Sequence, residues 1–368
     1  MSEATIATDE RDLTADTFVG RVFEAGVAAF DILSIAIGDR LGLYRSLAAD
    51  GSATPAELAA RTGIAERYAR EWLEQQAATG FLVVDDAAAP PDQRRFELPP
   101  GHAEALVDPE SPYSIAPLAR AFAACAGVLP QLLDAYRSGG GVDWSDYGRE
   151  MIEAQGDFNR PWLVNTFGTE YLPAVPDVHD RLVAEPPARV ADVACGVGWA
   201  SIAIARAYPN VRVDGFDLDP LSIDLARANA EAAGVADRVT FETRDAGHPK
   251  AAGRYDLAVM IEALHDLSRP VEVLEAMRAM LAPGGSVIIA DEKTADAFTA
   301  PADTMERMFY GFSIACCLPA AMTDPSSAGT GTVIRADTLR RYADAAGFRE
   351  TEVLDLDHDA LRFYRLTP

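Results

Sequence analysis

The chain has 368 residues, of which 49% are hydrophobic and 24% charged, as expected for a folded protein of two or three domains. Its 57 acidic residues outnumber its 32 basic residues, so the formal net charge is −25 at pH 7. Because so acidic a surface repels phosphate groups, we expect neither nucleic acid nor an anionic membrane as a partner.

The N-terminus and the cysteines favour a protein of the reducing cytoplasm. Residues 1–16 are acidic and polar, unlike a signal peptide, and no apolar run is long enough to span a bilayer. The four cysteines show no metal-ligand spacing, and the adjacent Cys316 and Cys317 are poor candidates for a disulfide. The sequence therefore predicts neither a metal site nor a structural disulfide.

The first predicted region, residues 1–100, has the pattern of a winged helix-turn-helix. Its predicted elements are an apolar helical stretch over Phe18–Leu47, a capped helix from Thr54, a second helix over Ala65–Thr79, and a two-stranded wing formed by 81–84 and 95–98. A DNA-binding regulator is one interpretation of this pattern. The charge opposes it, because residues 1–110 contain nine arginines and twenty carboxylates, a net charge of −11.

The second predicted region, residues 101–185, is helical and rich in aromatic residues. Tyr147, Trp162 and Phe167 are candidates for the wall of a substrate pocket. Aromatic side chains at helical spacing also form cores and interdomain contacts, so both interpretations stay open.

The third predicted region, residues 186–368, alternates short apolar strands with helices, which indicates a doubly wound, mostly parallel α/β sheet. The predicted strands are Arg189–Ala194, Val211–Phe216, Arg238–Glu242, Asp256–Ile261, Ser286–Ala290, Arg349–Leu356 and Leu361–Arg365. The predicted helices are Ala200–Ala207, Pro220–Ala233, Pro270–Leu281 and Thr338–Ala346. Only four residues separate the last two strands, so these must pair antiparallel.

Acidic residues stand where the first three of these strands end. Asp192 begins a turn that contains Gly196 and Gly198, where backbone can approach a ligand beside a helix N-terminus. Asp217 is placed to accept hydrogen bonds from the hydroxyl groups of a ribose, and Asp245 to accept one from an adenine amino group. The alternative interpretation of Asp245 is a turn residue, because turns favour aspartate. The glycine turn alone does not distinguish a dinucleotide from another adenosine cofactor.

Together these motifs resemble the class I S-adenosylmethionine-dependent methyltransferases. The matching segments are Asp192–Gly198, Phe216-Asp217, Asp245-Ala246 and the Leu281–Gly285 turn, followed by the antiparallel last strands. The resemblance implies a seven-stranded sheet, S-adenosylmethionine as cofactor, S-adenosylhomocysteine as product, and a homodimer formed by the N-terminal domain. It adds Ala194, Leu218, Ala246 and Ile261 to the cofactor surface. Ala194 stands where the family usually has glycine, and from its size we expect a tighter fit without loss of binding.

The segment after the fourth strand carries the candidate catalytic residues. His265 and Asp266 resemble the His-Asp stretch of small-molecule O-methyltransferases, in which the histidine is the general base. Glu262 is an alternative contact for cofactor or acceptor. His265 can also be a structural residue that hydrogen-bonds to backbone at a helix start, and both roles are kept open here.

A long insertion, residues 292–335, follows the fifth strand and is predicted to cover the binding crevice as a lid. Phe309 and Phe312 lie in it and suit a planar or apolar acceptor, although the same side chains can form an oligomer contact. The predicted function is methyl transfer to a small molecule, with oxygen favoured over nitrogen or carbon as the methylated atom. The alternatives are a methyltransferase fold with non-methylating chemistry and a ligand-sensing regulator.

Overall fold

The computed structural model describes residues 14–247 and 253–368, and the chain divides into two compact units, Met1–Ala123 and Ala124–Pro368. The boundary falls inside the predicted middle region, residues 101–185, which is therefore shared between the two units instead of forming a third one. Among the described residues, no single helix is long and apolar enough to cross a membrane, while one bent pair, Ala116–Gly127 with Leu129–Ser138, meets that criterion together.

The first unit has the predicted winged helix-turn-helix pattern. Its elements are α1 (Ala15–Arg40), α2 (Leu43–Asp50), α3 (Pro55–Thr62), α4 (Glu66–Ala78), β1 (Val83–Val84), β2 (Phe96–Glu97) and α5 (Pro100–Val107), with α6 (Ala116–Gly127) running across the boundary. Gly42 takes a left-handed φ of 70° and so divides the predicted Phe18–Leu47 helix into α1 and α2. Thr54 caps α3 reciprocally with Glu57, and β1 pairs antiparallel with β2 as the wing.

The second unit is built on one sheet, and its strands match the predicted ones closely. They are β3 (Arg189–Val193), β4 (Arg212–Asp217), β5 (Val239–Thr243), β6 (Tyr255–Ile261), β7 (Leu281–Glu292), β8 (Glu350–Val353) and β9 (Leu361–Thr367). Their order in the seven-stranded sheet is β5-β4-β3-β6-β7-β9-β8. The first five run parallel, and β9 pairs antiparallel with both β7 and β8.

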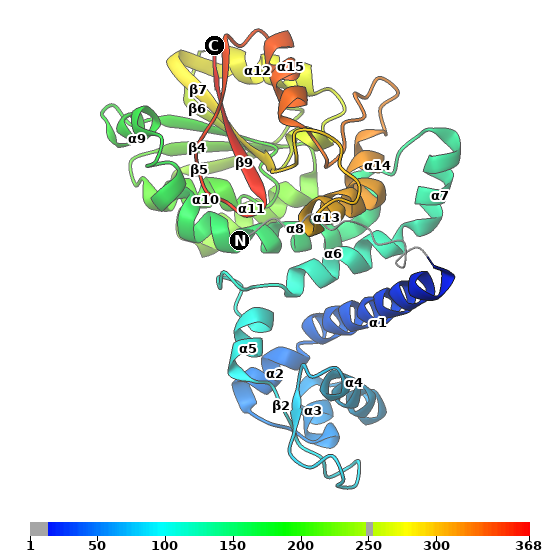
Figure 1. Cartoon of the computed structure of the whole chain (residues 1–368). Helices are drawn as coiled ribbons and strands as arrows, with labels where there is room; N and C mark the ends of the chain where they lie inside the picture. The colour runs from blue at the N-terminus through cyan, green and yellow to red at the C-terminus, as the bar shows by residue number, and fades with distance from the viewer. Residues whose placement is uncertain (1–13, 248–252) are drawn as a thin grey trace. The chain divides into compact units, whose positions relative to one another are not determined.

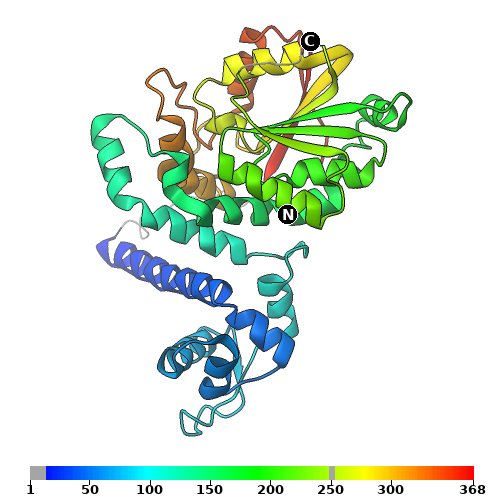
Figure 2. The same cartoon turned by 180° about the vertical axis from the view of Figure 1, so that it is seen from behind.

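Helices cover both faces of this sheet. The helical segments of the second unit are α7 (Leu129–Ser138), η2 (Trp144–Tyr147), α8 (Gly148–Trp162), η3 (Leu163–Tyr171), α9 (Pro176–Val183), α10 (Trp199–Ala207), α11 (Pro220–Ala232), η4 (Leu264–Asp266), α12 (Pro270–Met280), α13 (Thr304–Phe312), η5 (Ser313–Cys317), α14 (Leu318–Ala321) and α15 (Ala336–Ala345). Figures 1 and 2 show α10 and α11 against one face and α12 and α15 against the other, and each face has its own buried apolar cluster.

The order of the strands fixes where a ligand can bind. β4 lies on one side of β3 and β6 on the other, so the chain reverses its direction of travel across the sheet at β3. In open α/β sheets, ligands bind in the crevice outside the carboxyl ends of the strands at such a point. The predicted cofactor residues lie at or just after the carboxyl ends of β3, β4, β5 and β6 and therefore share this edge of the sheet.

Candidate functional site

Asp192, near the end of β3, is buried and anchors the first turn of α10. Its Oδ2 accepts a hydrogen bond from Ser201 Oγ at 2.6 Å, and the residue is 1% exposed. Burial raises the pKa of Asp192 to about 6, although the Ser201 hydroxyl opposes the shift. In this structure Asp192 fixes the turn between β3 and α10, which is a positioning role.

The turn after β3 needs left-handed backbone at three residues. Ala194, Gly196 and Gly198 have φ values of 57°, 50° and 86°. For alanine this conformation costs roughly 1–2 kcal/mol, which explains why glycine is usual at the position of Ala194. The requirement at Ala194 is thus one of backbone conformation and not only of side-chain size. A Cβ added at Gly196 would meet no described atom within 4 Å, so the backbone there faces open space.

Asp217, at the end of β4, connects the β4 tip to the glycine turn. Its Oδ2 accepts from the backbone N–H of Gly196 at 2.8 Å, and its Oδ1 accepts from Asp219 N–H at 2.9 Å. Burial raises the pKa of Asp217, against the lowering effect of these backbone hydrogen bonds. Leu218 beside it is 71% exposed and offers an apolar surface next to the carboxylate.

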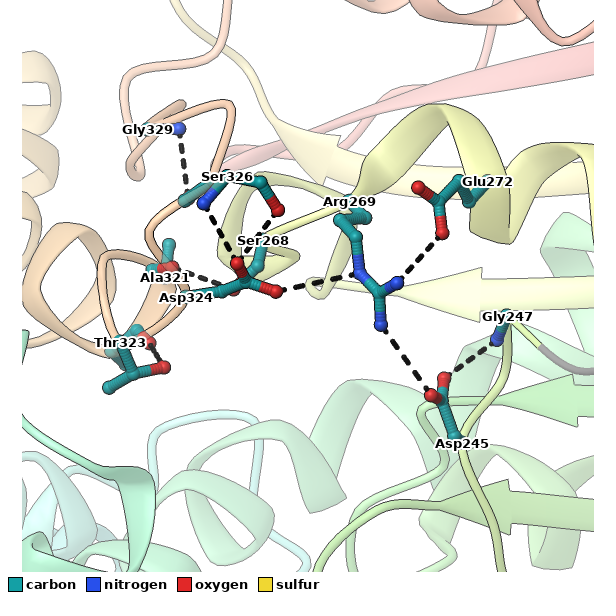
Figure 3. Close-up of polar contacts among 12 residues, drawn as sticks. Asp245, Gly247, Ser268, Arg269, Glu272, Ala321, Thr323, Asp324, Ser326 and Gly329 are labelled. Carbon is teal, nitrogen blue, oxygen red and sulfur yellow. Dashed lines mark hydrogen bonds and ion pairs between the residues drawn. The ribbon is translucent and has the colours of Figure 1, made fainter.

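Asp245, after β5, lies in a chain of charged groups that reaches the insertion. Figure 3 shows Arg269 between Asp245 and Asp324, with nitrogen–oxygen distances of 3.7 and 3.6 Å, and beside Glu272 at 3.0 Å. Asp245 also accepts from Gly247 N–H at 2.9 Å, and the adjacent Ala246 packs at the edge of a buried apolar cluster. Asp245 is thus oriented at its strand end by a turn hydrogen bond and a loose ion pair.

Arg269→Gln should weaken binding of S-adenosylhomocysteine by less than about fivefold, because partly exposed ion pairs contribute roughly 0–1 kcal/mol. The effect should shrink further in high salt. Calorimetric titration at low and high ionic strength measures both quantities. A loss of a hundredfold or more would show instead that Arg269 contacts the ligand directly.

Glu262 follows β6 and has an unusual backbone and environment. Its φ is 48°, and its Oε2 accepts from Gln155 Nε2 at 3.0 Å and from Asn159 Nδ2 at 2.6 Å. Burial raises the pKa of Glu262, while the Asn159 amide opposes the shift. Gln155 and Asn159 lie on α8 and were not predicted, since nothing in the sequence links them to a residue more than 100 positions away. The adjacent Ile261 is partly buried.

His265, in the 3₁₀ turn η4, is 2% exposed and surrounded by carboxylates. Its Nδ1 lies 2.7 Å from Asp291 Oδ1 and 2.8 Å from Glu292 Oε2, and its Nε2 lies 3.1 Å from Asp266 Oδ1. Burial alone would lower the pKa of His265, but Asp266, Glu292 and Asp291 together raise it well above 6.5. The sequence identified the Asp266 neighbour, whereas Asp291 and Glu292 come from the end of β7.

The insertion 292–335 packs onto the loop that carries His265. Gly331 N–H donates to the His265 carbonyl at 3.2 Å, and Ala328 N–H donates to the Ser268 carbonyl at 2.8 Å. Ser268 Oγ in turn donates to the Ala321 carbonyl at 2.6 Å. The insertion is therefore attached to residues 265–268 by these three hydrogen bonds.

The five predicted substrate residues differ in accessibility. Phe167 is completely buried against Trp162, and Tyr147 is buried with its hydroxyl donating to the Ala315 carbonyl at 3.0 Å. Phe309 is 7% exposed, while Trp162 and Phe312 are half-buried. Phe167 and Tyr147 are thus buried in the core, in agreement with the packing interpretation that the sequence left open for them. Helical aromatic spacing did not distinguish the two roles.

One hollow of the second unit, with a volume of about 430 Å³, lies away from these residues. It is lined by Arg278, Arg349 and Arg365 and by the Ala282–Gly285 turn near the start of β7. That is the amino end of β7, opposite the end at which His265 meets Asp291 and Glu292. The hollow is therefore not part of the candidate site.

Close packing holds α8 on the glycine turn. A Cβ added at Gly156 would lie 2.1 Å from Val197 Cγ2, closer than any side chain tolerates. Gly156→Ala should lower the free energy of unfolding by about 1–3 kcal/mol, the usual cost of overpacking. Adding Val197→Ala should restore most of that loss, as measured by chemical denaturation of both variants. No rescue would show that the two residues are not coupled.

Two family models match the chain. A Rv2258c-like winged HTH domain matches residues 28–107, and a methyltransferase domain matches residues 185–333. The second match covers the glycine turn, Asp217, Asp245, Glu262, His265 and most of the insertion.

The curated relatives described next match less than a third of the chain. Methyltransferase GfsG of Streptomyces halstedii is 32% identical over 31% of this chain and 41% of its own length. Norajmaline N-methyltransferase of Rauvolfia serpentina is 28% identical over 29% of this chain and 36% of its own length. The chain therefore spans well under two thirds of either relative.

Solved structures match nearly the whole chain at low identity. Human N-acetylserotonin methyltransferase, in complex with S-adenosylmethionine, has a TM-score of 0.70 at 17% identity and covers 96% of this chain and 99% of its own. Mitomycin 7-O-methyltransferase MmcR has a TM-score of 0.67 at 21% identity and covers 96% and 97%. The chain thus has the fold of these solved methyltransferases, and its matched domains are a winged HTH domain over residues 28–107 followed by a methyltransferase domain over residues 185–333.

Proposed function

We propose that the protein transfers a methyl group from S-adenosylmethionine to a small-molecule acceptor and releases S-adenosylhomocysteine. The observation that carries this proposal is the row of carboxylates at neighbouring strand ends, above all Asp217, which also holds the glycine turn. A sulfonium cofactor carries no phosphate and needs hydrogen-bond acceptors for its ribose, adenine and ammonium groups. These carboxylate acceptors therefore fit S-adenosylmethionine better than a dinucleotide.

The residues proposed to hold the cofactor lie on four strand ends and are Asp192, Ala194, Gly196, Gly198, Asp217, Leu218, Asp245, Ala246 and Ile261. The open space in front of Gly196 supports close approach of a ligand to the turn backbone. When bound, the cofactor supplies an electrophilic methyl group on a positively charged sulfur. Glu262 is proposed to face the same centre, from where its carboxylate can contact cofactor or acceptor.

His265 is proposed as the proton acceptor for an oxygen nucleophile. As the acceptor oxygen forms its bond to the methyl carbon, its O–H proton moves to Nε2, and the carbon–sulfur electron pair stays on sulfur. His265 must first lose its own Nε2 proton and its Asp266 contact, since the surrounding carboxylates keep it charged at neutral pH. Asp291 accepts from Nδ1 and thereby directs Nε2 towards the acceptor.

We propose that the acceptor lies against the accessible aromatic side chains. Trp162 and Phe312 are half-buried and can present a ring face to a planar molecule. Tyr147, Phe167 and Phe309 are buried, and Phe167 packs edge-on against Trp162. This arrangement supports an aromatic or apolar acceptor, as the sequence predicted.

The test is to incubate the full chain with S-adenosylmethionine and a panel of phenols, amines and thiols, and to quantify S-adenosylhomocysteine and methylated product by mass spectrometry. Methylated product with equal S-adenosylhomocysteine supports the proposal. Non-methylating chemistry would be indicated if the protein binds the cofactor and converts an acceptor but forms no S-adenosylhomocysteine. Tight binding to random duplex DNA in a mobility-shift assay would favour the regulator instead.

A homodimer formed through the first unit is also proposed. Helix α1 exposes a stripe of large apolar side chains at helical spacing, namely Phe18, Val19, Val22, Phe23, Val27, Phe30, Leu33 and Ile37. Such a stripe is expected to be covered, and a second copy of α1 offers the same self-complementary surface. The free state of all four cysteines supports a reducing compartment, and we propose the cytoplasm.

Phe30→Glu should shift the protein from dimer to monomer, because a charge would be buried in the proposed interface. The matched control is Phe298→Glu, since both phenylalanines are 72% exposed and Phe298 belongs to the other unit. Sedimentation equilibrium of both variants measures the change. If the Phe30→Glu variant remains a dimer, the proposal that α1 forms the interface is wrong.

A further inference from the structure

Three potential metal ligands of different chemistry meet on one side of the His265 ring. A ring nitrogen of His265, a carboxylate oxygen of Asp266 and Sγ of Cys317 all lie within 4.8 Å of one another. Nε2 is the nitrogen that faces Asp266, at 3.1 Å from Oδ1. Cys317 is the last residue of the π-helical segment η5, and such segments are often found at functional sites.

Carboxyl groups contact both nitrogens of the His265 ring. Asp291 and Glu292 are 0% and 7% exposed, and Asp291 Oδ1 and Glu292 Oε2 face Nδ1 at 2.7 and 2.8 Å. On the opposite side of the ring, Asp266 Oδ1 lies 3.1 Å from Nε2. Protein acceptors therefore occupy the Nδ1 side, and Nε2 is the nitrogen that can bind a metal ion together with Asp266 and Cys317.

The kind of donor decides which ion fits. Imidazole nitrogen, carboxylate oxygen and thiolate sulfur together suit zinc, whereas magnesium and calcium prefer oxygen ligands alone. The other side of the ring is arranged as at known zinc histidines, because Nδ1 lies 2.7 Å from Asp291 Oδ1. We propose that His265 Nε2, Asp266 Oδ1 and Cys317 Sγ form a binding site for a thiophilic divalent metal ion, zinc foremost.

Binding would change the protonation of two ligands. The His265 imidazolium loses its Nε2 proton and the Cys317 thiol loses its proton, and both protons go to solvent. The apparent affinity should therefore rise with pH, by up to about a hundredfold per pH unit while both groups remain protonated in the free protein.

The site also bears on catalysis, a part of the inference that rests on the proposed function. A metal ion on Nε2 occupies the atom proposed to accept the acceptor proton. Zinc should then inhibit methyl transfer, and the inhibition should disappear when the site is removed. Metal binding itself does not depend on this consequence.

Cobalt(II) reports on the site without any activity measurement, because a cobalt–thiolate bond gives a charge-transfer absorption in the near ultraviolet. Titration of the full chain with Co²⁺ should produce this band, and added Zn²⁺ should abolish it. Cys317→Ser should lose the band. The matched control Cys316→Ser should retain it, because the Cys316 thiol is buried beside Cys125. Asp291→Asn should weaken Co²⁺ binding about 10–100-fold.

The outcomes separate the two proposals. No band in the unmodified chain, or an equal band in Cys317→Ser, overturns the metal site, provided that circular dichroism shows both proteins folded. A band in a chain that never forms S-adenosylhomocysteine leaves the metal site standing and contradicts the proposed function. Where activity is present, zinc should inhibit the unmodified chain and Cys316→Ser but not Cys317→Ser. Equal inhibition of all three would place the inhibitory ion elsewhere and overturn the link to His265.

Discussion

His265→Asn is expected to lower the rate constant of methyl transfer to a phenol by about 10²–10⁴-fold, the usual contribution of a general base. Cofactor affinity should change little, because His265 is expected to contact the acceptor and not the adenosine. Asparagine fills less space than histidine but keeps a donor towards Asp291, so the fold should survive. Single-turnover kinetics measures the rate, and calorimetry with S-adenosylhomocysteine measures the affinity.

The pH dependence supplies a second readout for the same residue. Because three carboxylates raise the pKa of His265 well above 6.5, the neutral base is scarce at neutral pH. The rate should therefore increase with pH until the raised pKa is passed, and His265→Asn should lose this dependence. His102→Asn, at an exposed histidine of the first unit, is the control and should behave like the unmodified chain. An unchanged rate in His265→Asn would leave His265 with a structural role only.

Asp217→Asn should weaken binding of S-adenosylhomocysteine by about 10–100-fold, since a hydrogen bond to a charged group contributes roughly 1.5–3 kcal/mol. The substitution removes the charge and replaces one acceptor oxygen by a donor. That donor would face the backbone N–H of Gly196 or of Asp219, and each of these groups now donates a hydrogen bond to Asp217. The substitution should therefore loosen the glycine turn and also weaken the proposed contact between residue 217 and the ribose.

Asp224→Asn is the matched control for this measurement. Asp224 lies on α11, a few residues further along the chain, and its side chain is 73% exposed. It should leave the affinity unchanged. Equal affinity in Asp217→Asn and the unmodified chain would mean that the ribose is held elsewhere, and the cofactor assignment would lose its main support.

Much of the fold followed from local patterns. The predicted strands lie within a few residues of β3 to β9, because buried parallel strands are short apolar runs bounded by turns. β7 is the exception, since it begins at Leu281 and includes the Ala-Pro-Gly-Gly turn predicted to precede it. The boundary between the two units, at Ala123, was not predicted, because the helices on both sides have similar composition.

The candidate site was only partly predictable. The places of Asp192, Asp217 and Asp245 at neighbouring strand ends followed from the sequence, because parallel strands bring their carboxyl ends to one edge of the sheet. The partners of Glu262 and His265 were not found, because Gln155, Asn159, Asp291 and Glu292 reach them only through folding. Cys317 shows no metal-ligand spacing in the sequence, and only the fold of the insertion brings it near His265 and Asp266.

The sequence by itself determined the order of strands and helices, the acidic strand ends and the apolar stripe of α1, since each depends on residues that are neighbours along the chain. Only the tertiary structure decided that Phe167 and Tyr147 are buried and that His265 is enclosed by three carboxylates. Burial and the summed field of distant charges depend on where the folded chain places its segments, and these two quantities set the protonation of a histidine.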